Sequence, residues 1–63
     1  MTFINIVDKD GKNHWINPKN VEQISDDPYY DGSKIYFTSG RCIELADGSD
    51  KVVDMILGRM EKE

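Results

Sequence analysis

The sequence predicts an α+β fold: an antiparallel β-meander of four to five short strands with one C-terminal helix packed on one face. Two observations support it. Up to Leu45 the chain consists of short β-branched and aromatic segments, several of alternating polarity, separated by turn residues. From Ser49 onward the apolar residues take helical spacing instead. Because 63 residues bury only one small core, we expect a single domain over residues 1–63.

The first three strands follow from the turn residues between them. Residues 2–7 are rich in β-branched and aromatic side chains, and the Asp10-Gly11 pair after them is a strong hairpin signal. A second strand is therefore predicted over residues 13–17. An Asn-Pro turn follows, and we interpret residues 21–24 as a third short strand in preference to one helical turn.

The first hairpin has two alternative registers. A two-residue turn would pair Ile6 with Trp15 and make Trp15 part of the core. A three-residue loop with Gly11 in a left-handed bulge would pair Ile4 with Ile16 instead. We favour the second register, because it places the isoleucines on one face and points Trp15 away from it.

Residues 34–38 and 41–45 are predicted to form a second hairpin, because both alternate with period 2 around the tight turn Ser39-Gly40. With the bulged register of the first hairpin, the two hairpins present one aliphatic face to the helix. Its residues are Ile4, Ile6, Ile16, Ile35, Phe37, Ile43 and Leu45.

A helix of about 12 residues is predicted from Ser49 or Asp50, with Asp47 or Ser49 as its N-cap. Apolar residues recur at i, i+3, i+4 and i+7, so one stripe should face the sheet. The stripe consists of Val53, Ile56, Leu57 and Met60, with Val52 beside it. A helix this short is marginal alone, so we expect it to dock on the sheet.

The opposite face of the sheet has no second helix to cover it. The apolar residues predicted there are Phe3, Val7, Trp15, Tyr36 and Cys42. One interpretation is a solvated face with a few exposed rings. The other, which we favour, is a partner or dimer surface anchored by Trp15 and Tyr36, because Trp and Tyr are enriched where interfaces bury their anchors.

Residues 26–32 read DDPYYDG and carry two adjacent rings among three acids. One interpretation is a turn set by Pro28, with one tyrosine folded back over the sheet edge. The other is a recognition loop that binds a basic partner. Its candidate partner-binding residues are Asp26, Asp27, Tyr29, Tyr30 and Asp31.

The charge balance and composition exclude several classes of protein. Twelve acidic against eight basic residues, for a net charge of −4, argue against nucleic-acid binding through phosphates, which requires a concentrated basic face. No apolar run approaches the about 20 residues of a membrane span, and the N-terminus lacks the pattern of a signal peptide. We therefore expect a cytoplasmic protein that does not insert into membranes. The single cysteine, Cys42, agrees with a reducing compartment.

No set of residues assembles an active site or a metal site, so we expect neither an enzyme nor a cofactor. The DKDGKN segment does not fit a calcium loop, because Asn17 would stand at the twelfth position, where a glutamate is needed. His14 is the only imidazole, and we interpret it as structural. We interpret Cys42 as a small apolar residue of a strand.

The segment DGKNHWINPKNVEQI resembles part of the small FlbD-type (SwrD-like) flagellar accessory proteins, which runs strand, Asn-Gly hairpin, strand ending in Asn, then Ile-x-x-Ile. The segment KIYFTSGRCIEL and the acidic, capped helix after it resemble their second half. The match places on the family pattern Gly11, Asn17, Val21, Ile24, Ile35, Phe37, Gly40, Ile43 and Leu45. The resemblance implies a non-enzymatic cytosolic accessory protein that acts through protein contacts, and it supports the bulged register.

Two functions remain as alternatives. The first is a small protein-binding or regulatory module that contacts another protein, or a second copy of itself, through the exposed aromatics and the Tyr-Tyr loop. The second is an acidic inhibitor of phage type, anti-CRISPR-like or DNA-mimicking, that blocks a basic nucleic-acid-binding groove; small phage proteins share this size and acidity. Salt separates the two, because only the inhibitor's affinity should fall steeply with ionic strength.

Overall fold

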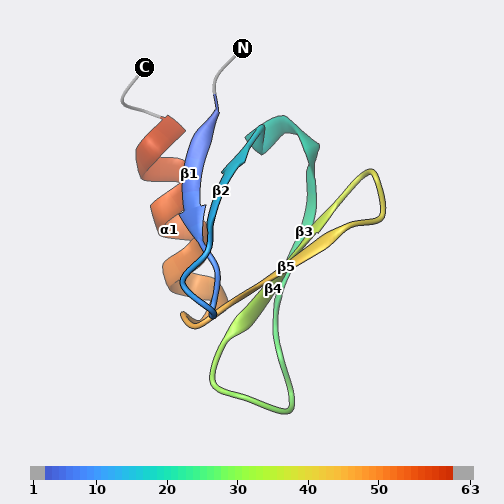
Figure 1. The fold of residues 1–63 in the computed structure, drawn as a ribbon, viewed down its shortest axis with the longest axis vertical. Coiled ribbons are helices and arrows are strands. Elements are labelled where there is room, and N and C mark those ends of the chain that lie inside the picture. The colour runs from blue at the N-terminus through green and yellow to red at the C-terminus, as the bar shows by residue number, and fades with distance from the viewer. Residues whose placement is uncertain (1–2, 61–63) are drawn as a thin grey trace.

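The computed structural model describes residues 3–60 and has the predicted α+β architecture of five antiparallel strands followed by one helix (Figure 1). In chain order the elements are β1 (Ile4–Val7), β2 (Asn13–Ile16), the 3-10 helix η1 (Pro18–Asn20), β3 (Val21–Asp26), β4 (Ser33–Phe37), β5 (Cys42–Leu45) and α1 (Ser49–Met60).

The strands form two sheets and not one continuous meander: β1 pairs with β2, and β3, β4 and β5 form a second sheet in that order. The break lies at η1. Pro18 has no N–H to donate to a ladder, and the side chain of Asn17 accepts a hydrogen bond from the Lys19 N–H at 3.0 Å, which turns the chain between the sheets.

The first hairpin has the predicted bulged register, in which Ile4 pairs with Ile16 and Ile6 with His14. Gly11 has a φ of 84°, and its N–H donates to the Asp8 carbonyl at 3.0 Å. A positive φ is accessible to glycine at little cost, so the three-residue loop closes without strain.

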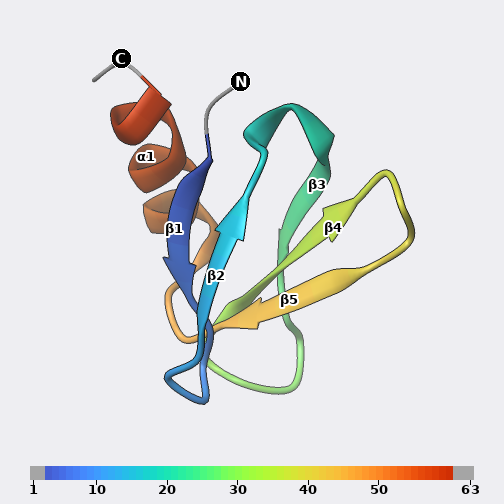
Figure 2. The same cartoon turned by 45° about the horizontal axis from the view of Figure 1, so that its top comes forward.

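The core lies between the two sheets and the helix. Its buried side chains are Ile4, Ile6, Ile16, Ile35, Leu45, Val52 and Ile56, and Val21, Ile24, Phe37 and Ile43 pack against them half-buried. The predicted aliphatic face is therefore confirmed. The helix contacts β1, β3 and β4 and covers one side of this core (Figure 2).

The predicted inward stripe of the helix is wrong in part. Val52 and Ile56 are the buried helical residues, whereas Val53, Leu57 and Met60 are exposed. The buried pair is spaced i, i+4, so the face turned to the sheet is narrower than the predicted stripe and rotated from it. This face packs against β1, β3 and β4.

The predicted N-caps are also corrected. The Val52 N–H donates to the Gly48 carbonyl at 3.1 Å, so Gly48 holds the N-cap position and has no side chain to cap with. The carboxylate of Asp26, at the end of β3, instead accepts from the Ser49 N–H at 2.8 Å. The Ser33 hydroxyl donates to the Asp47 carbonyl at 2.8 Å. These two bonds tie the helix start to β3 and β4.

Candidate protein-binding surface

An exposed apolar cluster covers the outer face of the first hairpin. Trp15 is 68% exposed, and Phe3 and Val7 are exposed as well. Trp15 stands opposite Asn5 in the register, so Phe3 and Val7, two residues on either side of Asn5, are its diagonal neighbours. The bulged register thus places Trp15 outside the core, as predicted from the sequence.

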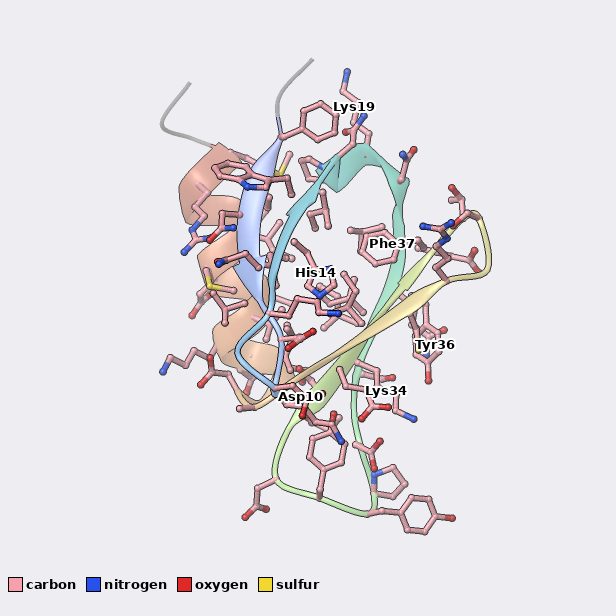
Figure 3. All side chains as sticks on the ribbon, in the orientation of Figure 1. Asp10, His14, Lys19, Lys34, Tyr36 and Phe37 are labelled. Atoms are coloured by element: carbon pink, nitrogen blue, oxygen red, sulfur yellow. The ribbon has the colours of Figure 1, made fainter. Side chains whose placement is uncertain are left out.

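Tyr36 belongs to the other sheet and is half-buried. It pairs with Cys42 in the register of β4 and β5. Figure 3 shows its ring on the side of the second sheet that lies away from α1. Trp15 and Tyr36 lie in different sheets, and Tyr36 is not among the residues that line the groove beside Trp15.

Trp15 borders a groove of about 440 Å³ between β2 and the β4–β5 hairpin. Its lining residues outside β2 include Phe3, Phe37, Arg41, Cys42 and Ile43. Phe37 and Ile43 are core residues that remain only half-buried at this point. The sequence did not predict the groove, since it arises where the meander is interrupted; the signal that could have indicated it is the Asn-Pro turn after Ile16.

The two tyrosines of the DDPYYDG loop have different environments. Tyr29 is 93% exposed. Tyr30 is folded back: its hydroxyl donates to the Ser33 carbonyl at 3.1 Å, and the Lys9 ammonium lies 5.0 Å from the centre of its ring. Burial is the main cause that raises the pKa of the Tyr30 hydroxyl. Tyr30 thus has the folded-back position of the turn interpretation, whereas Tyr29 is exposed.

The three acids of this segment also have different environments. Asp26 caps α1, as described above. The carboxylate of Asp27 accepts from the Tyr29 N–H at 2.7 Å and lies 3.2 Å from the Lys34 ammonium. The Tyr29 N–H is the largest cause that lowers the pKa of Asp27, and Lys34 adds to it. Asp31 is exposed. Of the seven candidate residues, Asp26, Asp27 and Tyr30 therefore have structural roles within the chain.

His14 and Asp8 organise the first hairpin. The His14 Nε2 atom lies 2.8 Å from one carboxylate oxygen of Asp8. The other oxygen accepts from the Asp10 and Lys12 N–H groups at 2.9 and 3.0 Å. The bond to His14 is the largest cause that lowers the pKa of Asp8, followed by the Lys12 N–H. An aspartate two residues before a turn is a recognised turn signal, but its bond to His14 depends on the register.

These carboxyl groups predict a loss of stability in acid. The folded-state pKa values of Asp8 and Asp27 are lowered, so the folded protein binds fewer protons than the unfolded chain below about pH 4. The contribution of these two carboxylates to the free energy of unfolding should therefore be constant above about pH 4. It should fall as the pH drops through their folded-state pKa values. Urea denaturation at a series of pH values between 2 and 7 measures this.

Asp27→Asn tests the assignment, and Asp31→Asn is the matched control in the same loop. Asp27→Asn should be less stable at pH 7 and should lose less stability on acidification, because it has no carboxylate to protonate at that site. Asp31→Asn should follow the wild-type curve. Parallel acid curves for wild type and Asp27→Asn would show that this carboxyl is not a source of the acid dependence.

Within residues 3–60, no group of three or more His, Cys, Asp or Glu side chains is placed to hold a metal ion. In the same part of the chain, no helix has the length and apolar character needed to cross a membrane. No family model matches the chain, and neither curated proteins nor solved structures give a significant match to it.

Proposed function

We propose that this protein is a non-catalytic protein-binding or regulatory module, with a binding surface centred on Trp15. The observation that carries the proposal is the 68% exposure of Trp15 beside exposed Phe3 and Val7. Covering a tryptophan side chain contributes about 4 kcal/mol to an association before entropy costs.

The tip of the DDPYYDG loop is a second, smaller contact region. Tyr29 and Asp31 are exposed, while the side chains of Tyr30 and Asp27 form hydrogen bonds that fix the loop conformation. A rigidly held loop with an exposed tyrosine presents a large contact area at low entropy cost. Figure 1 places this loop, between β3 and β4, at the opposite end of the molecule from η1. A partner that contacts both regions would therefore lie along the length of the protein.

The resemblance to FlbD-type flagellar accessory proteins supports the same class of function, an accessory protein that acts through protein contacts. The acidic-inhibitor alternative has less support. It relies on Asp26, Asp27, Asp31 and the acids of the helix, and of these Asp26 and Asp27 already bind groups of the same chain. We therefore rank the aromatic contact above the charge-based one.

Affinity capture from the native cell tests the proposal. The wild-type protein should retain a specific protein at both 50 mM and 500 mM salt, because an aromatic-anchored contact depends little on ionic strength. Trp15→Ala should lower the retained amount at least about tenfold, as expected for an interface anchor. Tyr29→Ala should have a smaller effect. Leu57→Ala, which removes an exposed apolar side chain of α1, is the matched control and should change nothing.

Two outcomes would reject the proposal. Equal capture by wild type and Trp15→Ala would remove Trp15 from the interface, and capture lost at 500 mM salt would favour the acidic inhibitor. Sedimentation of the wild type beside Trp15→Ala separates self-association from partner binding. A wild-type dimer that dissociates in Trp15→Ala would assign the surface to a second copy of this chain.

A further inference from the structure

The groove beside Trp15 is bordered by two strands that each have a free edge. Within residues 3–60, β2 pairs only with β1, and β5 pairs only with β4. Residues of both strands line the same groove. Figure 2 shows β2 and β5 diverging from the end where the first hairpin loop meets β5. A free strand edge is a template for a further strand.

The backbone of β5 has hydrogen-bonding groups directed to this edge. The Arg41 carbonyl accepts from the Phe37 N–H at 2.9 Å, so Arg41 directs its backbone toward β4. Backbone groups alternate between the two edges of a strand, and those of Cys42 and Glu44 therefore point away from β4. The Lys9 N–H donates a hydrogen bond to the Glu44 carbonyl at 2.9 Å, so this carbonyl is already paired. In the described chain, Cys42 N–H and C=O and Glu44 N–H remain for a partner strand.

The groove has a mixed lining of apolar and polar residues. Its apolar residues include Phe3, Trp15, Phe37 and Ile43. Figure 3 shows the ring of Phe37 projecting into the space between the two sheets, together with that of His14. The groove of about 440 Å³ is large enough for apolar side chains of an added strand.

Arg41 gives the groove its charge. It is the one permanently charged residue among the lining residues, in a protein with a net charge of −4. Among residues 3–60, no carboxylate forms an ion pair with its guanidinium. Arg41 directly precedes β5, two residues before Ile43, and both residues line the groove. An acidic group therefore complements the groove at one position and an apolar group at the position two residues away.

We propose that this groove binds an extended, acidic segment of a partner protein by strand addition to the free edge of β5. The segment pairs with the backbone of Cys42 and Glu44, places an apolar side chain against Phe37 and Ile43, and places a carboxylate on Arg41. This proposal rests on the proposed protein-binding function and names the chemistry of the partner. It commits to another protein as the occupant, and pairing with a second copy of this chain is one of the outcomes of the test.

Selection of random octapeptides displayed on phage against the wild-type protein tests the proposal. Enriched peptides should carry an acidic residue two positions from a large apolar residue, in a β-compatible sequence. Synthetic versions of the enriched peptides should slow hydrogen exchange of the Cys42 and Glu44 amides, measured by NMR on the wild-type protein. N-methylation of alternate peptide backbone groups should abolish binding.

Two variants separate the contacts. Arg41→Glu should weaken binding of the enriched peptides about tenfold or more, and selection on this variant should enrich Lys or Arg in place of the acid. Cys42→Pro removes one N–H on the free edge and should weaken all strand-like binders. Arg59→Glu makes the same change of charge on α1 and should leave the affinity within about twofold. If Cys42→Pro fails to fold, amide exchange in the wild type still tests the edge.

Three outcomes would overturn the proposal. The first is that no consensus peptide is enriched. The second is a consensus whose binding is insensitive to Arg41→Glu and that does not protect the Cys42 and Glu44 amides. The third is a dimer of this chain paired through the β5 edge. A cellular partner whose capture depends on Trp15 but not on Arg41 would reject the groove and leave the proposed function intact. Peptides that bind the groove, when no cellular partner depends on Trp15, would support the groove and reject the proposed function.

Discussion

Gly32→Ala is expected to lower the free energy of unfolding by about 3 kcal/mol, a large part of the roughly 3 to 9 kcal/mol available to a chain of this size. A Cβ atom on Gly32 would overlap the backbone carbonyl oxygen of Leu45 and the ring of Tyr30. The Gly32 backbone is also bonded on both sides, because its N–H donates to the Tyr30 carbonyl at 2.9 Å and its carbonyl accepts from the Asp27 N–H at 3.0 Å. The loop therefore has no room to move away.

Gly58→Ala is the matched control. Gly58 lies inside α1, and apart from the backbone of the helix itself a Cβ atom there would have no neighbour within 4 Å. Alanine is the better helix former, so this variant should be more stable than the wild type by about 1 kcal/mol. Thermal and urea denaturation of both variants measure the difference. A Gly32→Ala protein as stable as the wild type would show that Tyr30 does not fold back over this position.

Val52→Ala is expected to lower the free energy of unfolding by about 2 kcal/mol, which corresponds to a fall of roughly 8 to 16 °C in Tm. Val52 is fully buried, with 0% of its surface exposed, and it belongs to the core between the helix and the two sheets. Removing two methyl groups there loses their burial and leaves a cavity that a close-packed interior fills only in part. The same denaturation experiments measure this.

Val53→Ala tests the rotation of the helix directly. Val53 is the next residue and is 38% exposed, so the same chemical change should alter stability by less than about 0.5 kcal/mol. Alanine's higher helix propensity offsets part of the lost contact. The opposite order, with Val53→Ala the more harmful change, would restore the inward stripe predicted from the helical spacing and reject the observed rotation.

Local features of the chain predicted most of the fold. The turns follow from glycine, whose positive φ values of 84° at Gly11 and 92° at Gly40 are those that tight hairpin loops require. The register of the first hairpin followed from keeping Ile4 and Ile16 on one face, and it placed Trp15 outside. These predictions succeed because loop length and side-chain alternation are properties of a few neighbouring residues.

The helix rotation and the roles of the loop residues were not predictable in this way. Asp26 caps a helix that begins 23 residues later in the chain. Gly48, at the N-cap position, therefore needs no capping side chain. Helical spacing alone admits both the Val52–Ile56 face and the neighbouring Val53–Leu57 face. The buried face is the one that packs against β1, β3 and β4, which lie far away in the chain and are not encoded in the local spacing.

The adjacent tyrosines show the same division. From residue types and spacing alone it follows that the chain makes two hairpins and a helix, that Trp15 points away from the core, and that the loop after β3 carries two rings among acids. Which ring stays exposed, which acids are free, and where β2 and β5 leave a groove became defined when distant segments packed together. The physical reason is that alternation and turn geometry act over a few residues, whereas caps, ion pairs and strand edges are completed by groups far away in the chain.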